Sequence, residues 1–240
     1  MGTFSGTATN WLCYATDPKS KIYKIREIAD LCSTSQIRPP DSGASVQIIT
    51  VDGRGAKTRA GQPINGNYAA EKVPPSENDY SIGLVIKFGN IVYTTMGDLD
   101  GEFATSSFGY TYNHVEAVVA PRVGEVDIYR ANHHGSSHSS SQELLSAMKP
   151  TITIFSCGNG NSYGHPSQEA IDRVAGVGSD MYLTTFCAND RNYKGANLNF
   201  GDIKISSTDG NKYTLSGVFS TKNVIYIAKP NKKAGVCIKV

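Results

Sequence analysis

Short apolar runs that alternate with helical patterns constrain the fold of this chain more than any other feature. Leucine and methionine recur at helical spacing in residues 139–148, among serines that can cap a helix, and Ser167 precedes a second such pattern at residues 168–174. The apolar, β-rich runs that we expect to form strands lie at residues 45–51, 81–88, 90–96, 126–129, 151–156 and 181–186. Strands and helices that alternate in this way predict an α/β fold.

Further elements are expected on both sides of this region. Gly89 and Asn90 separate two of the apolar runs, which predicts a tight hairpin. Apolar residues at helical spacing predict an amphipathic helix over residues 21–32. The remaining expectations are a loop over residues 53–67, a hairpin of residues 202–206 and 212–218, and a strand over residues 223–228.

Length and charge set broad limits on structure and function. A chain of 240 residues with 39% hydrophobic content can bury one substantial core, so a single domain over residues 1–240 is expected. Its 23 basic and 21 acidic residues nearly balance, so bulk charge does not attract nucleic acid. No run of about 18 apolar residues and no export signal is present, so no membrane span is predicted.

The cysteines are odd in number and widely spaced. They fit neither a zinc-ribbon pattern nor a dense disulfide framework, so buried free thiols are expected. A nucleophilic Cys157 with His165 as its base is a weak alternative, because nothing in the sequence lowers the pKa of that thiol. The five cysteines are Cys13, Cys32, Cys157, Cys187 and Cys237.

Two adjacent histidines follow a strand-like run and suggest a metal site. His133 and His134 precede Gly135 at the point where residues 126–129 end. Imidazole is the commonest protein ligand for divalent transition metals, and a strand end can hold it at a fixed geometry. The alternative is a pair of surface histidines in a polar loop. Ser136 could orient His134, because ligating histidines normally need a second partner.

Asp98 and His165 lie at comparable positions after two other strands. Asp98 ends the run at residues 90–96, where a carboxylate can bridge two cations, although Gly97-Asp98 is also ordinary turn chemistry. His165 precedes a proline in a loop and can either act at the site or hydrogen-bond its own loop. His114 and His138 are expected to be surface residues.

Four motifs follow one another in a fixed order along the chain. They are Asn78-Asp79-Tyr80-Ser81, Gly97-Asp98, His133-His134-Gly135-Ser136 and Ser-Cys-Gly-Asn-Gly-Asn-Ser-Tyr-Gly-His-Pro at residues 156–166. Together they resemble the second half of a metallo-β-lactamase-fold hydrolase, in particular the hydrolase domain of ComEC-type competence proteins and their free-standing relatives. The similarity covers roughly residues 77–175. It implies a four-layer αββα sandwich, incomplete in its N-terminal half.

One family motif is absent from the chain. The family opens with His-x-His-x-Asp-His or His-x-Asp-x-Asp-His, whereas the first histidine here is His114. The abrupt start at Met1 favours the C-terminal portion of a longer enzyme over a member that has lost metal-dependent catalysis. Because a catalytic metal needs about three protein ligands and an open position, we expect little or no activity from this chain alone.

The resemblance implies a role for each candidate residue. Asp98 would bridge two divalent ions, and His133 or His134 would ligate the second ion. Asn78 stands where many members of the fold carry a ligating histidine, and its amide oxygen suits Mn²⁺ better than Zn²⁺. Asp98 and His165 would be the catalytic residues, with His165 stabilising charge on the leaving side.

The implied reaction is hydrolysis of a phosphodiester, in DNA, a nucleotide or another small molecule, by a metal-activated water. Lactonases and other esterases share the fold. Two further alternatives stay open. The chain could be a non-catalytic binding or scaffold domain, or a subunit whose missing ligands come from another chain.

Overall fold

The computed structural model describes residues 18–19, 27–40, 43–64, 75–106, 109–221 and 223–239. The chain divides into two compact units, Met1–Asp30 and Leu31–Val240. All helices and strands below belong to the second unit. No helix in the described part of the chain is long and apolar enough to cross a membrane.

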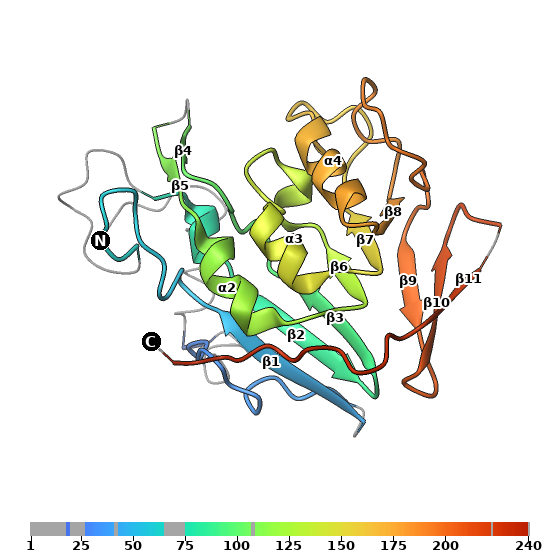
Figure 1. Cartoon of the computed structure of the whole chain (residues 1–240), viewed down its shortest axis with the longest axis horizontal. Helices are drawn as coiled ribbons and strands as arrows, with labels where there is room; N and C mark the ends of the chain where they lie inside the picture. Colours follow the sequence, from blue (N-terminus) through green and yellow to red (C-terminus); the bar gives the residue numbers. More distant parts are fainter. Residues whose placement is uncertain are drawn as a thin grey trace. The chain divides into compact units, whose positions relative to one another are not determined.

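A six-stranded mixed sheet forms the centre of this unit (Figure 1). The first three strands pair antiparallel, and the third strand continues into a parallel set of four. Because parallel strands end at the same edge, the loops after them lie close together. In spatial order the strands are β1 (Ala44–Thr50), β2 (Gly83–Phe88), β3 (Ile91–Thr95), β6 (Ile128–Arg130), β7 (Ile152–Phe155) and β8 (Asp180–Leu183).

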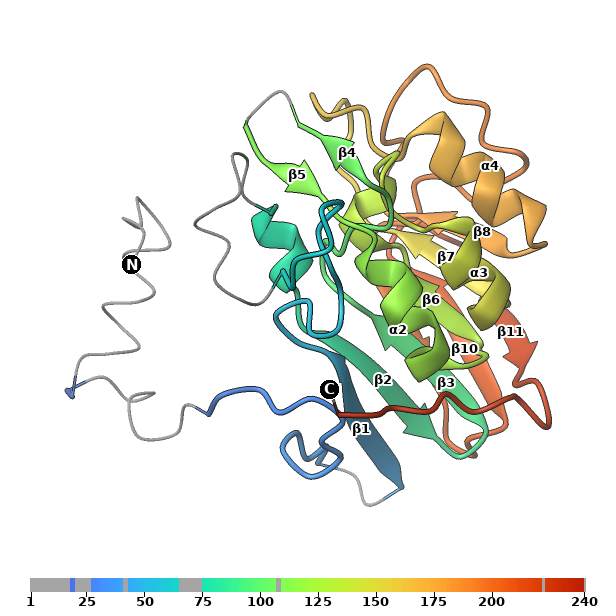
Figure 2. The ribbon, with the colours of Figure 1, turned by 60° about the vertical axis from the view of Figure 1, so that its left-hand side comes forward.

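Three helices cover one face of this sheet, as Figure 2 shows: α2 (Val115–Val123), α3 (Gln142–Met148) and α4 (Gln168–Gly176). Ser141 and Ser167 cap α3 and α4 by accepting hydrogen bonds from backbone amides of the first turn. Burial of apolar side chains between helices and sheet is the main stabilising force here. This core includes Val119, Leu144, Ile171, Tyr129, Phe155 and Leu183.

A second, three-stranded sheet packs on the opposite face of the first. Alternate residues of β7 point into different cores: Phe155 packs with the helices, whereas Ile152 and Ile154 pack with Tyr213 and Leu215 of the second sheet. Its strands, in spatial order, are β11 (Val224–Ile227), β10 (Lys212–Gly217) and β9 (Ile203–Ser206). The described unit therefore has three layers, helices, mixed sheet and small sheet.

The expected α/β fold class is confirmed, but the expected four-layer sandwich is not. On the outer face of the small sheet, Ile225 and Ile227 of β11 are 67% and 71% exposed. In the part of the chain that the structure describes, no helix covers them. The remaining elements are short: 3₁₀ turns η1 (Glu77–Tyr80) and η2 (Asn132–Gly135), and strands β4 (Ala104–Thr105) and β5 (Thr111–Tyr112).

One expectation about secondary structure needs correction, and one helix was not expected. Residues 21–26 of the expected helix lie outside the described residues, and residues 27–32 are not helical. Helix α2 was not predicted, because Pro121 interrupts its pattern and proline disfavours helix interiors. The expected hairpin of β2 and β3 and the expected strand at β1 are confirmed.

The expectation of free thiols is wrong for four cysteines. Cys32 is bonded to Cys237 and Cys157 to Cys187, with Cα–Cα distances of 5.5 and 5.4 Å. The weak alternative of a nucleophilic Cys157 is therefore wrong, because its sulfur is in a disulfide, and Cys13 lies outside the described residues. Partners separated by 205 and 30 residues are brought together by tertiary structure, which spacing alone does not reveal.

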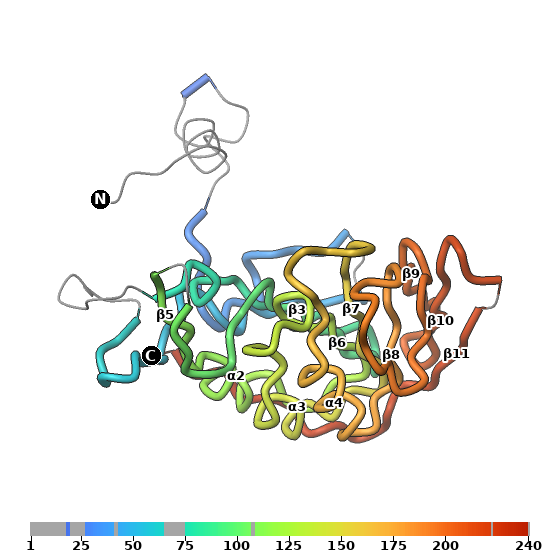
Figure 3. The backbone as a smooth tube through the Cα atoms, turned by 90° about the horizontal axis from the view of Figure 1, so that it is seen from above, coloured from blue at the N-terminus to red at the C-terminus, as the bar shows by residue number. Residues whose placement is uncertain are grey.

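The C-terminal segment returns from β11 past α2, as Figures 1 and 3 show. Its backbone bonds to the end of α2, where Val236 N donates to Pro121 O and Ala234 bridges Gly124. The Cys32–Cys237 disulfide then links it to the segment before β1. The segment therefore joins elements that are distant in sequence.

Candidate functional site

A cavity of about 410 Å³ opens where β3, β6 and β7 end. All five candidate residues line it, although they come from four separate segments. Asn78 lies in η1, Asp98 follows β3, and His133 and His134 form η2 after β6. His165 is in the loop after β7. The expected convergence of these side chains is therefore present in the structure.

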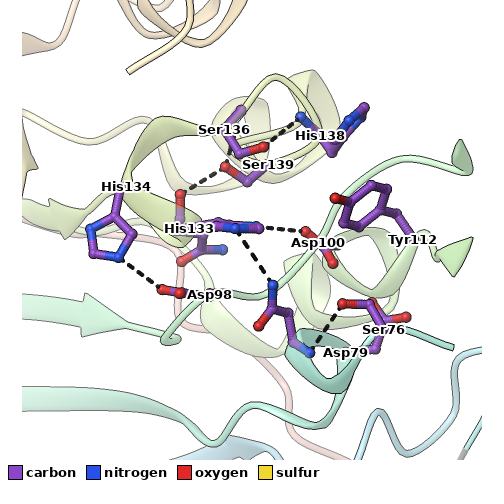
Figure 4. A network of polar contacts seen from close by, with 12 residues as sticks. Ser76, Asp79, Asp98, Asp100, Tyr112, His133, His134, Ser136, His138 and Ser139 are labelled. Atoms are coloured by element: carbon purple, nitrogen blue, oxygen red, sulfur yellow. Dashed lines mark hydrogen bonds and ion pairs between the residues drawn. The ribbon is translucent and has the colours of Figure 1, made fainter. Parts of the chain in front are cut away.

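His133 is held by a buried carboxylate. Its Nδ1 lies 3.0 Å from Asp100 Oδ1, and its Nε2 lies 3.5 Å from the Asn78 amide nitrogen. Burial alone would lower the pKa of His133, but the bond to Asp100 and the charges of Asp100 and Asp98 raise it above its usual value. Figure 4 shows His133 directed toward Asp100. Asp100 therefore fixes the ring so that Nε2 faces Asn78.

Asp100 was missed by sequence reasoning. It is completely buried, and burial raises its pKa despite the bond to His133. Its place two residues after Asp98 was the available signal, since a second carboxylate next to a candidate ligand is a common orienting partner.

His134 faces Asp98 from the other side of the turn, as Figure 4 also shows. Its Nδ1 is 2.6 Å from the carbonyl oxygen of Ser156, and its Nε2 is 3.6 Å from Asp98 Oδ1. Ser156 therefore orients His134. The predicted role of Ser136 is wrong, because its backbone amide donates to His133 O and its hydroxyl accepts from His138 N.

His165 has a different electrostatic environment. Burial, with the neighbouring His133 and His134, lowers the pKa of His165 to about 4, so the ring is neutral near pH 7. Its Nδ1 is buried and has no hydrogen-bond partner among the described residues. Asn161 positions the backbone, accepting from His165 N at 3.0 Å and donating to His165 O at 2.6 Å.

Arg130 is a second residue that sequence reasoning missed. Its Nη1 donates to Gly97 O at 2.8 Å and lies 3.8 Å from Asp98 Oδ1. The guanidinium therefore holds the Gly97-Asp98 turn and partly neutralises its carboxylate. Its position at the end of β6, three residues before His133, was the available signal.

The other two histidines, which were expected at the surface, are partly exposed and take part in local contacts. His138 stacks on Tyr112 with ring centroids 4.4 Å apart, and His114 Nε2 lies 3.0 Å from Glu143 Oε2. Neither lines the cavity.

The donor spacing fits part of a metal site. Two donors of one tetrahedral ion, each about 2.1 Å from the metal, lie about 3.4 Å apart. The 3.6 Å between His134 Nε2 and Asp98 Oδ1 is close to that value. Over the described residues, however, no group of three or more His, Cys, Asp or Glu side chains is arranged to hold a metal ion. A third donor would have to come from a group such as the Asn78 amide.

Comparison with known proteins finds partial similarity. No protein-family model matches the chain. ComE operon protein 3 of Bacillus subtilis (strain 168) is 29% identical over 98 residues, which are 41% of this chain and 11% of that protein. Recombination protein 2 of Haemophilus influenzae (strain ATCC 51907 / DSM 11121 / KW20 / Rd) is 34% identical over 59 residues, 25% of this chain and 8% of that protein.

The chain thus spans about a tenth of the length of these curated relatives. Part of the chain is similar to competence-related proteins, as expected. These matches do not extend to the expected metallo-β-lactamase fold.

Proposed function

We propose that this chain carries part of the active site of a metal-dependent hydrolase with a metallo-β-lactamase-like fold of the ComEC type, acting on a phosphodiester. The observation that carries the proposal is the arrangement of the two imidazoles around Asp98. Each Nδ1 is bound to a protein oxygen, Asp100 for His133 and Ser156 for His134, so each Nε2 faces another candidate donor, Asn78 for His133 and Asp98 for His134. Ligating histidines in proteins are held in this way.

Asp98 and His134 would hold one divalent ion, Mn²⁺ or Zn²⁺, with Asn78 or His133 as a further donor. Amide and carboxylate oxygens favour Mn²⁺, whereas imidazoles suit Zn²⁺. The bound ion would lower the pKa of a water so that hydroxide is available near neutral pH. Residues 1–113 contain no histidine, so further imidazole donors would have to come from another polypeptide segment. We therefore expect weak binding of one ion and low activity.

The remaining residues of the site have defined tasks. Asp100 and the Ser156 carbonyl keep the two imidazoles in the tautomer with a proton on Nδ1. His165 stays neutral near pH 7, so one ring nitrogen carries a proton and would donate a hydrogen bond to an anionic oxygen of the substrate. Arg130 offsets charge beside Asp98.

We also propose that the chain has part of an αββα sandwich fold. Helices, mixed sheet and small sheet correspond to three layers of an αββα sandwich. A fourth, helical layer would cover the exposed Ile225 and Ile227 on the outer face of the small sheet.

The test is a calorimetric titration of the full chain with MnCl₂ and with ZnCl₂, followed by hydrolysis of bis(4-nitrophenyl) phosphate at saturating metal. We expect one ion per chain and a low rate that depends on metal. Asp98→Asn should abolish both, whereas Asp202→Asn, at an exposed site before β9, should change neither. Absence of binding, or binding that Asp98→Asn leaves unchanged, would contradict the proposal, and tight binding of two ions would contradict the incomplete site.

A second candidate function is a non-catalytic binding domain of the same fold. Arg130 lies 3.8 Å from Asp98, so the carboxylate already has a cationic partner, and among the described residues a third protein donor of the usual types is missing. Binding of a nucleotide without metal, and no hydrolysis of any phosphodiester, lactone or carboxylic ester, would favour this candidate.

A further inference from the structure

The loop that carries both candidate histidines has an unfavourable backbone conformation. We call residues 131–141 the histidine loop. His133, His134 and Gly135 have consecutive positive φ values of 46°, 55° and 79°. Residues other than glycine rarely adopt this conformation, and it persists only where surrounding groups hold it. Groups that bind the loop from neighbouring elements must therefore stabilise it.

Glu116 of α2 binds the histidine loop at both ends. Its Oε1 accepts hydrogen bonds from the Asn132 side-chain amide and the Ser140 backbone amide, both at 2.8 Å. Its Oε2 accepts from the Ser141 backbone amide at 2.6 Å. The carboxylate is completely buried. A Cβ at Gly101 would lie 2.3 Å from Glu116 Oε2, so the chain leaves room for the carboxylate at that position.

Arg173 of α4 binds the carbonyl groups of the same loop. Its Nη2 donates to Ser137 O and Ser139 O at 2.8 Å, and its Nε donates to Ser140 O at 3.0 Å. A planar guanidinium can bind several carbonyls at once, which a lysine ammonium does with less geometric control. Glu116 thus binds N–H groups of the loop and Arg173 binds its C=O groups.

We propose that Glu116 and Arg173 are positioning residues that hold the histidine loop so that His133 and His134 face the cavity. Neither residue lines the cavity. They bind the Asn132 side chain before the strained histidines and the backbone of residues 137–141 after them, through six hydrogen bonds from two different helices. An effect of these two residues on metal binding rests on the proposed function. Their effect on the orientation of the His133 and His134 rings does not depend on that function.

The test uses the full chain with ¹⁵N-labelled histidine and reads two quantities. The imidazole nitrogen signals of His133 and His134 report ring tautomer and environment, and calorimetry reports Zn²⁺ affinity. Glu116→Gln puts an amide N–H where an oxygen accepts, so we expect shifted ring signals and Zn²⁺ affinity lowered about tenfold or more. Glu143→Gln, a glutamate on the exposed side of α3, should leave both unchanged.

Arg173 variants keep the test decisive if Glu116→Gln does not fold. Arg173→Met removes all three donors to the loop and should shift both ring signals, whereas Arg173→Lys should restore part of the wild-type spectrum. Variants that lower the thermal midpoint but keep wild-type ring signals would overturn the inference. If the wild-type chain binds no Zn²⁺, the proposed function fails, but the ring signals still decide whether these residues position the histidines.

Discussion

His133 and His134 are adjacent in the chain but bind different orienting groups. His133 is held by the carboxylate of Asp100 and His134 by the carbonyl oxygen of Ser156. Of these two orienting groups only Asp100 is a carboxylate, and it raises the pKa of His133. His165, whose Nδ1 has no such partner among the described residues, forms a third type. Measuring the pH dependence of His133 and of His165 therefore tests the partners assigned to each of these residues.

Asp100→Asn should lower the pKa of His133. Asp100, through its hydrogen bond and its charge, is the main group that favours the protonated ring, and together with Asp98 it outweighs the opposing effect of burial. The raised pKa of His133 contributes stability that is present at low pH and is lost as pH rises through the folded-state pKa. The measurement is an NMR titration of the His133 ring in both proteins. An unchanged pKa in the variant would contradict the assigned partner.

His165 should give the opposite pH dependence. Its folded-state pKa is lowered to about 4 from the ordinary value of 6.5, so the unfolded chain takes up a proton between these values while the folded chain does not. Stability should therefore fall as pH falls through this window, by at most about 1.4 kcal/mol per pH unit from this group. Urea unfolding at several pH values should show a smaller slope for His165→Gln. Tyr163→Phe, in the same loop, should keep the wild-type slope.

At the scale of elements, the site depends on strands ending at the same edge. β3, β6 and β7 are parallel, and their following loops supply Asp98, the histidine pair and His165. The loops are packed against each other at Gly135. A Cβ there would lie 2.7 Å from both Phe155 Cε1 and Pro166 Cβ, and the φ of 79° is also unfavourable for other residues.

Gly135→Ala should destabilise the fold by about 2 kcal/mol or more, because it combines overpacking with a strained backbone. Gly158→Ala is the matched control, since it lines the same cavity and nothing lies within 4 Å of an added Cβ. Chemical denaturation measures both. Equal stability of the two variants would show that Gly135 is not tightly packed in solution.

At the scale of the whole molecule, the C-terminal segment connects distant elements. The buried side chain of Asp127 accepts from Val92 N and Lys229 N at 2.8 and 2.9 Å, and it pairs with Lys232 at 2.9 Å. The Cys32–Cys237 disulfide adds a covalent link across 205 residues. Removal of this link frees the unfolded chain more than removal of a short-range disulfide would.

Cys237→Ser should therefore lower the free energy of unfolding by about 3–5 kcal/mol. Val236→Ser, at an exposed side chain next to it, should cost little. Urea unfolding under non-reducing conditions measures both variants. A loss below about 1 kcal/mol would contradict the presence of this disulfide in solution.

Much of the central fold could be predicted from local sequence. The strands at β1, β2, β3 and β7 and the serine caps of α3 and α4 follow from apolar runs and capping chemistry, which act between near neighbours. The gathering of Asp98, His133, His134 and His165 was also predictable, because each follows a strand of the same sheet. Their chemical roles remain predictions.

The tertiary structure decided what depends on distant contacts. The disulfides do not show in sequence spacing, and the spacing of Asp100 from Asp98 does not reveal which histidine it binds. Helix α2 forms despite Pro121 because its buried face packs on the sheet. The physical reason is that periodicity and capping report interactions within a few residues. Burial, which lowers the pKa of His165, exists only after the chain has folded, and so does the packing that brings Asp100 to His133 and Glu116 to the histidine loop.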